Sequence, residues 1–373
     1  MKKSLWKKLN IRTRHFSCNI PLFLLELAVL IVVLGSLDFV DKMTMIRKVD
    51  INEADIVVNK QFEETDPAVR EDKKKTRKED KPFRNIALFG VDSRSGTLDQ
   101  GRSDTIMIAS INTTTHEIRL ISVYRDTYLN LGNDTYNKCN AAYAKGGAKQ
   151  AMNMLNMNLD MDISDYVTVG FDGLIRAIDS LGGVEVDVKE KEIVHLNNYQ
   201  KSMFMKDEND IENLNEDIVE VEKSGLQNLS GLQATAYCRI RYVGDDYART
   251  ERQRAVIKAM LEKASGVSNP KLTSTAYALM PYISTSFSVG EILSVLGDIG
   301  QYSLTESSGF PYEEYRTAAN LGSCGSCIVP LTLSENVMIL HGSLFEDMDY
   351  RVSPTVSGIS SEIESKTKKY TGE

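Results

Sequence analysis

Three short apolar runs that lie close together constrain the fold of this chain more than any other feature. They cover residues 85–91, 105–111 and 119–124, and they are rich in Ile and Val. Runs of this length and composition are typical of buried strands rather than of helices. We therefore expect three strands of one sheet, with the polar loop 92–104 at the edge of that sheet.

Charged side chains gather where these three strands would end. They are three acids and three arginines: Asp92, Arg94, Arg102, Asp104, Arg125 and Asp126. Carboxylate oxygens hold hard cations such as Mg2+, and arginine forks hold phosphate oxygens, so this mixture suits a magnesium-assisted phosphate site. The same residues are equally consistent with a surface network of ion pairs.

The N-terminal part carries one long apolar segment. Residues 20–37 contain Glu26 as their only charge, and a helix of this length spans roughly 27 Å, close to the apolar thickness of a bilayer. We predict a transmembrane helix at 20–40, with the basic residues 1–19 in the cytoplasm and the rest of the chain outside it. A cleaved signal peptide is the alternative, although the segment ends without the pair of small residues that marks a cleavage site. The charged residues 41–82 are expected to form a solvated linker.

The charge balance and the cysteine content exclude two broad classes of protein. The formal net charge is -8 although the first 19 residues are basic, so the remainder is still more acidic. Wholesale nucleic-acid binding needs a basic face, and we predict no nucleic-acid partner. Five Cys are too few for a disulfide scaffold. Cys324 and Cys327 resemble half of a zinc site that lacks its second pair of ligands, which leaves a local disulfide or two free thiols.

The middle of the chain alternates between helical and strand patterns. Residues 147–161 form a Met-rich apolar stripe at helical spacing, which indicates either core packing or the wall of a lipid groove. A strand at 165–171, a helix at 172–183 and a strand at 184–188 come next, which predicts a βαβ unit with a parallel strand pair. The acidic residues 189–223 indicate an irregular surface excursion.

Two arginines lie close together after this excursion. Ser230 and Gln233 fit a capping box that opens a short helix. Residues 236–243 then alternate as in a strand, which puts Arg239 and Arg241 on one face, roughly 7 Å apart. Guanidinium groups at that spacing repel each other unless an anion lies beside them.

The charged run 244–254 leads into an amphipathic helix and adds three candidate site residues, Asp246, Arg249 and Gln253. These residues also have ordinary structural roles available. Thr250 and Gln253 fit a capping box, and the arginines of the run fit a solvated helix face.

The C-terminal part shows two further helical patterns after residue 266. From them we expect a mostly helical C-terminal extension over residues 265–350, and then a tail over residues 351–373.

Eight sequence blocks, taken in order, resemble the LytR-CpsA-Psr family of cell-wall phosphotransferases. They are FGVDSR, GRSDTIMI, YRDTYL, NAAYAKGG, DYVTVGFDGL, DSLGGVEVDV, GLQNLSGLQATAYCRIR and DDYARTERQR. The resemblance covers residues 83–264 and implies a catalytic domain of the α/β class there, with three α/β/α layers around a mixed central sheet. It also implies a single-pass protein of the cell membrane in a Gram-positive type of envelope, with the catalytic domain extracellular.

The family also implies an activity. Its members transfer an anionic glycopolymer, such as teichoic acid or capsular polysaccharide, from an undecaprenyl-diphosphate carrier to a peptidoglycan acceptor, with Mg2+ or with Mn2+ in its place. A polyprenyl-diphosphate pyrophosphatase side activity is part of this expectation. Two other functions are open: a membrane-bound transcriptional regulator of cell-envelope genes, and a polyprenyl-diphosphate binding protein without catalysis.

The resemblance assigns roles to individual residues. The family's metal-site carboxylates match Asp92 and Asp104, and Asp104 is also the candidate general base. The substrate-binding candidates are the diphosphate-holding arginines Arg102, Arg125, Arg239 and Arg241, the headgroup-contacting Gln253, and Arg94, Asp126, Asp246 and Arg249 from the same blocks. Two positions depart from the family: Tyr124 stands where Pro is usual, and Cys139 where an apolar residue is usual.

Overall fold

The computed structural model of the protein describes residues 47–48, 51–52, 55–59, 82–91, 98, 101–204 and 218–371. The basic segment 1–19, the transmembrane helix expected at 20–40 and most of the linker 41–82 lie outside these residues. Among the helices of the described part, none is both long enough and apolar enough to cross a membrane. Arg47–Glu373 form one compact unit.

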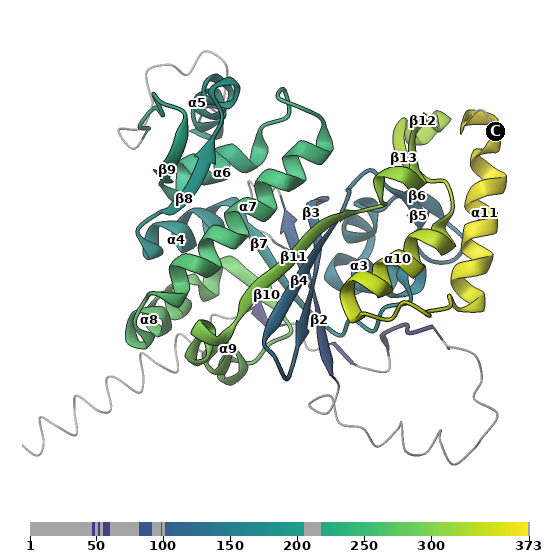
Figure 1. Ribbon diagram of the computed structural model, residues 1–373, viewed down its shortest axis with the longest axis horizontal. Helices are drawn as coiled ribbons and strands as arrows, with labels where there is room; N and C mark the ends of the chain where they lie inside the picture. Colours follow the sequence, from purple (N-terminus) through teal and green to yellow (C-terminus); the bar gives the residue numbers. More distant parts are fainter. Residues whose placement is uncertain are drawn as a thin grey trace, which may run out of the picture. The chain divides into compact units, whose positions relative to one another are not determined.

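A seven-stranded mixed sheet lies at the centre of this unit (Figure 1). Its strands have the order β1-β10-β7-β2-β3-β4-β11. They are β1 (Arg47–Lys48), β2 (Phe83–Val91), β3 (Ser103–Asn112), β4 (Glu117–Val123), β7 (Asp165–Gly170), β10 (Ile283–Thr285) and β11 (Ser303–Phe310). The three strands predicted from the apolar runs are confirmed as β2, β3 and β4, and β3 pairs antiparallel with both of its neighbours.

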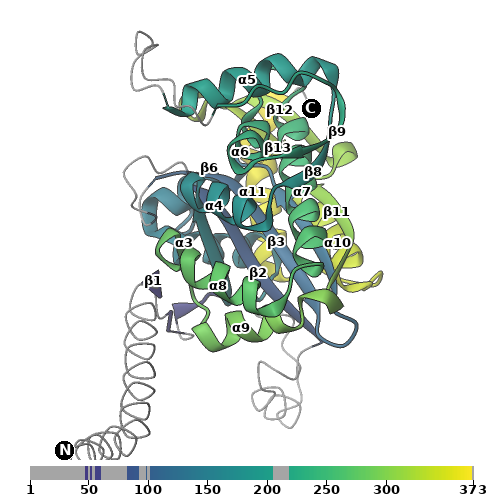
Figure 2. The same ribbon diagram turned by 90° about the vertical axis from the view of Figure 1, so that its left-hand side faces the viewer.

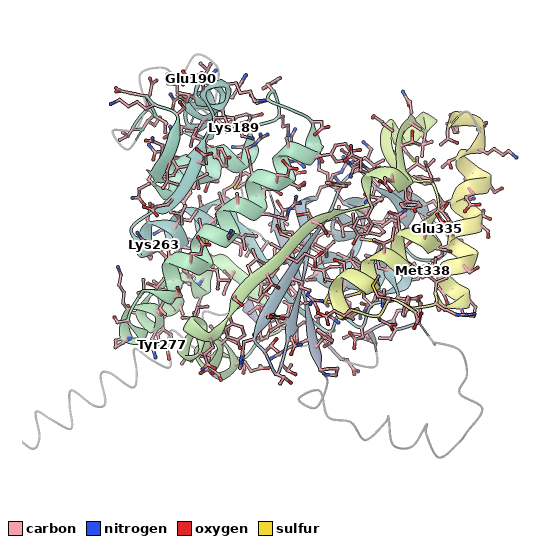
Figure 3. All side chains as sticks on the ribbon, in the orientation of Figure 1. Lys189, Glu190, Lys263, Tyr277, Glu335 and Met338 are labelled. Carbon is pink, nitrogen blue, oxygen red and sulfur yellow. The ribbon has the colours of Figure 1, made fainter. Side chains whose placement is uncertain are left out.

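Helices cover both faces of the sheet, which confirms the expected mixed sheet with flanking helices (Figures 1 and 2). One face, which we call the α3 face, carries α3 (Ala141–Leu159), α10 (Leu333–Phe345) and α11 (Pro354–Thr371). The other, the α7 face, carries α4 (Phe171–Leu181), α7 (Asp246–Ser265), α8 (Asn269–Leu279) and α9 (Val289–Gly297). Figure 3 marks the two sides by Glu335 and Met338 on α10 and by Lys263 and Tyr277 on α7 and α8.

The α3 face is filled with large apolar side chains. Met152, Met154 and Leu155 of α3 are completely buried, and they share one core with Phe89 and Ile121 of the sheet. Unbranched thioether side chains adapt to irregular gaps in such a core. Of the two interpretations of the Met-rich helix, core packing is therefore confirmed.

The strand after α4 departs from the predicted βαβ unit. β8 (Val184–Val188) pairs antiparallel with β9 (Gly225–Leu229) in a separate two-stranded ribbon, so the predicted parallel pair is wrong. In β8 the valines are buried while Glu185 and Asp187 are exposed. A parallel strand inside a sheet is apolar on both sides, whereas valines alternating with acids suit a ribbon that has one side in solvent.

The expected irregular excursion over residues 189–223 contains a helix, so that prediction is wrong for its first part. α5 (Glu190–Phe204) packs against α6 (Gly231–Arg239). Glu192 on α5 forms a buried ion pair with Arg252 of α7, with 3.1 Å between Oε1 and Nη1. The acidic composition alone did not indicate a helix. Arg252, which neutralises Glu192, lies far along the chain and could not be recognised as its partner.

The strand predicted over residues 236–243 is also wrong. The capping box of Ser230 and Gln233 is confirmed, but the helix that it opens, α6, continues to Arg239. The residues of α6 that precede Arg239 are all buried, because other helices surround it. A helix that is buried on all sides has no polar stripe. Its sequence therefore showed no helical period and resembled the alternation of a strand.

The start of α7 lies earlier than expected. Asp245 caps this helix, since its Oδ1 accepts hydrogen bonds from the backbone N–H groups of Tyr247 and Ala248 at 3.0 and 3.1 Å. Thr250 already lies inside the helix and donates its hydroxyl to the carbonyl oxygen of Tyr247. The capping box predicted for Thr250 and Gln253 is therefore wrong.

The segment expected to form a mostly helical extension supplies two strands of the central sheet. β10 pairs antiparallel with β7, and β11 pairs parallel with β4, so the structure differs from the boundary expected at residue 264. The expected tail 351–373 contains α11. Two hairpins complete the fold, one formed by β5 (Tyr128–Asn130) and β6 (Tyr136–Lys138), the other by β12 (Arg316–Asn320) and β13 (Ser326–Pro330). Cys324 and Cys327, near the turn of the second hairpin, are free thiols.

Candidate functional site

A cavity of about 690 Å3 lies between the sheet and the helices of the α7 face. Its walls include Leu88 and Val167 of the sheet, Leu272 and Leu279 of α8, and Leu296 of α9. The lining is predominantly apolar, which suits a ligand with a long hydrocarbon part. The charged and amide-bearing residues of the lining are Asp104, Arg239, Arg241, Arg249 and Gln253.

Asp104 is the carboxylate around which the cations of the cavity are arranged. It is the second residue of β3, directly after Ser103, which pairs with the last residue of β2, Val91. Arg125 Nη1 lies 2.7 Å from Asp104 Oδ1, and Arg241 Nη2 lies 3.4 Å from Asp104 Oδ2. Each oxygen of this carboxylate therefore faces a different guanidinium group.

Arg125 is the most highly paired of these cations. It lies just after the end of β4 and contacts two more carboxylates, with its Nε 3.5 Å from Asp126 Oδ2 and 3.7 Å from Asp246 Oδ1. Burial acts to lower the pKa of Arg125, but Asp104, Asp246 and Asp126 outweigh it, so the pKa is raised. Arg125 is thus held charged in a half-buried position.

Arg249 lies in the first turns of α7 and is almost completely buried. Its Nη2 is 2.9 Å from Asp246 Oδ1 and donates to the main-chain oxygen of Asp104 at 3.3 Å. Burial lowers the pKa of Arg249, and the nearby Arg125 and Arg241 lower it further, against the opposing effect of Asp246. An anion placed beside Arg249 would offset this repulsion.

Asp246 is the counter-charge at the start of α7. Burial raises the pKa of its carboxyl group, against the lowering effect of Arg249 and Arg125. Its Oδ2 is buried, and no hydrogen-bond partner for that atom occurs in the described part of the chain. The carboxylate of Asp246 therefore offsets only part of the positive charge of the nearby arginines.

Arg239 and Arg241 reach the cavity from the end of α6 and from the connection after it. The guanidinium of Arg239 lies 4.6 Å from the ring centroid of Phe171 and 5.6 Å from that of Tyr199. The side chain of Arg241 is 51% exposed, so this end of the cavity is open to solvent. The two arginines lie in one neighbourhood, as the sequence predicted, although a helix end rather than a strand brings them there. We call Arg125, Arg239, Arg241 and Arg249 the arginine cluster.

Gln253 lines the cavity one turn after Arg249. Its Nε2 donates to the carbonyl oxygen of Cys238 at 3.4 Å, whereas its buried Oε1 has no hydrogen-bond partner among the described residues. A buried acceptor without a partner costs about 1–3 kcal/mol, which a ligand with a hydroxyl or amide donor would recover.

The remaining predicted residues fall into three groups. Asp126 is close to the cluster and forms a second ion pair, with Lys138 Nζ 2.9 Å from Asp126 Oδ1. Arg102 is exposed in the connection before β3, and within the described residues no ion pair joins it to the cluster. Asp92 and Arg94 lie outside the described residues.

The charge balance of this neighbourhood favours an anionic ligand. Among the described residues, four cations, Lys138, Arg125, Arg241 and Arg249, form ion pairs with three carboxylates, those of Asp104, Asp126 and Asp246. The cations are therefore in excess. Lys138 had not been singled out from the sequence, because its only signal was its place two residues before the block NAAYAKGG.

A metal site is only partly represented in the described residues. Within them, no group of three or more His, Cys, Asp or Glu side chains is arranged to hold a metal ion. The carboxylate of Asp104 has the hard oxygen donors that Mg2+ prefers, and it lies at the open end of the cavity beside the end of β2. Asp104 therefore fits one half of the predicted ligand pair.

Sequence comparison now identifies the family. A sequence model of the LytR_cpsA_psr family matches residues 53–309. The chain belongs to this family. The match extends beyond residue 264 and includes β10 and all but the last residue of β11, in agreement with their place in the central sheet.

Curated relatives of the family share part of their length with this chain. A polyisoprenyl-teichoic acid–peptidoglycan teichoic acid transferase, TagU of Enterococcus faecalis, is 35% identical over 202 residues, which cover 52% of this chain and 59% of the relative. TagV of Bacillus subtilis, with the same transferase name, is 29% identical over 58% of this chain and 52% of its own length. The chain thus matches less than two thirds of the length of either relative.

Solved structures of the family share the fold. The crystal structure of B. subtilis TagV aligns with a TM-score of 0.57 at 25% identity, covering 73% of this chain and 99% of TagV. A structure of TagT with bound octaprenyl pyrophosphate lipid aligns with a TM-score of 0.53 at 21% identity, covering 72% of this chain and 93% of TagT.

Proposed function

We propose that this protein is a membrane-anchored extracellular phosphotransferase, which transfers an anionic glycopolymer from a polyprenyl-diphosphate carrier to peptidoglycan. The observation that carries the proposal is a predominantly apolar cavity whose lining also contains three members of the arginine cluster, Arg239, Arg241 and Arg249. Such a shape suits a ligand with a hydrocarbon tail and a strongly anionic head. The transferase name of the TagU relative and the lipid bound to TagT support the same ligand class.

The cavity supports the lipid part of the carrier. Leu88 and Val167 of the sheet and Leu279 and Leu296 of the opposing helices offer apolar contact on both sides. Burial of each methylene group in such a site is worth about 0.8 kcal/mol, so even part of a polyprenyl chain supplies substantial binding energy. Unlike the core on the α3 face, this cavity is not filled by side chains of the protein.

The arginine cluster supports the diphosphate part. Arg239, Arg241 and the buried Arg249 line the cavity, and the half-buried Arg125 pairs with the lining residue Asp104. Guanidinium groups form bidentate hydrogen bonds with phosphate oxygens, and those bonds are strong at partly buried positions. Gln253, with its free buried acceptor, would contact a hydroxyl or amide donor of the first sugar.

The proposed reaction is an in-line displacement at phosphorus. A hydroxyl oxygen of the peptidoglycan acceptor forms a bond to the sugar-linked phosphorus, the bond to the polyprenyl phosphate breaks, and the hydroxyl proton passes to a base. Asp104 is our candidate base, and each of its carboxylate oxygens faces a guanidinium group. Most of the rate enhancement would then come from positioning and from arginines that stabilise the charge that develops on the phosphate oxygens.

Mg2+, or Mn2+ in its place, belongs to the proposal. Asp104 would hold the ion together with Asp92, which lies outside the described residues. When bound, the ion supplies positive charge to the diphosphate oxygens.

The proposal is tested with the full-length protein in detergent, a lipid-linked glycopolymer and a peptidoglycan acceptor. The Arg239→Ala, Arg241→Ala double variant should lose about 100- to 1,000-fold in kcat, or roughly 2.7–4 kcal/mol of transition-state stabilisation. Lys258→Ala, Lys263→Ala removes the same charge from exposed positions further along α7 and should transfer at the wild-type rate. Near-normal transfer by the arginine double variant would contradict the proposal.

The same assay separates catalysis from binding alone. A protein that only binds the carrier would retain octaprenyl pyrophosphate without releasing polyprenyl phosphate in the presence of acceptor. Release of polyprenyl phosphate without acceptor would demonstrate the pyrophosphatase side activity. No observation on the described residues favours the regulator alternative.

A further inference from the structure

The β12–β13 hairpin lies beyond the part of the chain that matches the family model, yet it contacts the candidate site directly. Ile328 of β13 donates its backbone N–H to the carbonyl oxygen of Asp126 at 2.9 Å. Ile328 also forms a parallel bridge with Thr127. The hairpin therefore supports the turn that carries Arg125 and Asp126.

Arg316, the first residue of β12, makes the most extensive of these contacts. Its guanidinium carbon lies 3.6 Å from the ring centroid of Tyr247 and 5.0 Å from that of Tyr124. Its Nη1 donates to the hydroxyl oxygen of Tyr124 at 3.1 Å and to the carbonyl oxygen of Pro311 at 2.9 Å. The two tyrosine rings pack edge to face, with centroids 4.6 Å apart.

The two tyrosines belong to different arms of the site. Tyr124 directly precedes Arg125, which pairs with Asp104. Tyr247 comes directly after Asp246 and two residues before Arg249, in the first turn of α7. Arg316 thus joins both segments that hold the buried arginines of the cluster, although it touches neither arginine.

The placement of Tyr124 depends on the C-terminal segment in a second way. The backbone N–H of Tyr124 donates to the carbonyl oxygen of Phe310 at 3.0 Å. A Cβ atom on Gly309 would lie only 1.9 Å from the hydroxyl oxygen of Tyr124, so the ring occupies space that only glycine leaves open. Tyr124 is therefore held by β11 as well as by Arg316.

We propose that Arg316 is a positioning residue, which sets the distance between Arg125 on the β4 turn and the Asp246–Arg249 pair on α7 by clamping Tyr124 and Tyr247. The inference rests on the proposed phosphotransferase function and deepens it by assigning a role to the segment after β11. Stacking by a planar guanidinium fixes the rings in a way that a lysine ammonium cannot.

The test compares full-length wild type, Arg316→Gln and Arg119→Gln in detergent, with a lipid-linked glycopolymer and a peptidoglycan acceptor. Arg119 is the matched control because it also ties the sheet to the C-terminal segment, donating to the carbonyl oxygens of Ser343 and Leu344 and pairing with Glu346. Arg316→Gln should lose roughly 10- to 100-fold in kcat, since small misplacements of charge-stabilising groups have effects of this size. Its KM for the lipid substrate should stay within a few-fold, and Arg119→Gln should keep the wild-type kcat.

Three further results decide between positioning and general stability. Free guanidinium ion added to Arg316→Ala should restore part of kcat, and Arg316→Lys should fall between wild type and Arg316→Gln. If Arg316→Gln does not fold at the assay temperature, Tyr124→Phe replaces it, because it removes only the hydroxyl that Arg316 bonds and should lower kcat by a few-fold at an unchanged melting temperature.

The failures of the two proposals can be told apart. Equal kcat values for wild type, Arg316→Gln and Tyr124→Phe would overturn the positioning role and leave the phosphotransferase function intact. Equal loss of kcat and melting temperature in Arg316→Gln and Arg119→Gln, without rescue by guanidinium, would also overturn it. A wild-type protein without transfer activity would overturn the proposed function and this inference with it.

Discussion

The two faces of the central sheet share the same strands but differ in how closely helices pack against them. On the α3 face, Met152, Met154 and Leu155 are completely buried in one apolar core with the strands. On the α7 face, the helices leave a cavity of about 690 Å3 next to residues such as Leu88. The first face supplies stability, whereas the second gives up packing contacts and keeps room for a ligand. The charged groups that we assign to the reaction accordingly gather on the second face.

The largest effect should come from the charged end of the cavity. Asp104→Asn removes the carboxylate that joins Arg125 to Arg241, and we expect transfer to fall about 100- to 1,000-fold while the melting temperature changes little. Asp298→Asn, at an exposed position after α9, is the control and should transfer normally. Transfer by Asp104→Asn at more than a tenth of the wild-type rate would show that the function of the α7 face does not depend on this carboxylate.

A matched pair of bulky substitutions tests the contrast directly. Ala151 of α3 is completely buried in the filled core, so Ala151→Trp should lower the free energy of unfolding by about 3 kcal/mol or more. Ala276 of α8 lines the cavity, so Ala276→Trp should cost less than about 1 kcal/mol but prevent binding of octaprenyl pyrophosphate. Urea denaturation and lipid binding measure the two effects. Equal loss of stability in both variants would show that the cavity is not accessible space.

The stability of the α3 face should depend on pH through a buried histidine. His341 of α10 is buried, hydrogen-bonds to the carbonyl oxygen of Leu159 and stacks on Tyr350; burial lowers its pKa below the ordinary 6.5, against the raising effect of that bond. A lowered pKa means that its contribution to stability is complete above pH 6.5 and is lost as the pH falls through the folded-state pKa.

Urea unfolding at a series of pH values below 7.5 measures this loss, and the free energy of unfolding should fall as the pH is lowered. His341→Gln should flatten that part of the pH dependence. An unchanged pH dependence in the variant would assign the acid sensitivity to other groups.

The smallest effect concerns helix caps on the α7 face. Asp245→Ala removes the cap of α7, and Ser288→Ala removes the capping box of α9, so each should lower the free energy of unfolding by about 1 kcal/mol. Only Asp245→Ala should also lower kcat, by a few-fold, since the first turn of α7 carries Asp246 and Arg249. Equal kcat values in the two variants would show that the start of α7 tolerates movement.

Local patterns predicted much of the core of the fold. The three strands β2, β3 and β4, the Met-rich helix and the capping box at Ser230 could be inferred from hydrophobic period and cap chemistry, which are written within a few neighbouring residues. The charged residues at the strand ends were also visible, and Asp104, Arg125 and Asp126 do meet in space.

Features that depend on distant partners were missed or wrongly predicted. α6 was taken for a strand because burial on all sides removed its polar stripe, and β11 was not foreseen because its partner β4 lies almost two hundred residues earlier. Arg316 carried no motif at all, since its tyrosine partners are separated from it and from each other in the sequence. Such residues become recognisable only once the chain has folded.

The parallel pairing of β11 with β4 has a consequence for how this protein can be shortened. A chain cut before residue 303 would retain Asp104, Gln253 and the arginine cluster, but the N–H and C=O groups along one side of β4 would lose their partners. An edge strand with unpaired N–H and C=O groups pairs readily with other chains. The truncated protein should therefore aggregate instead of remaining soluble with reduced activity. A shortened form of this protein therefore has to keep β11.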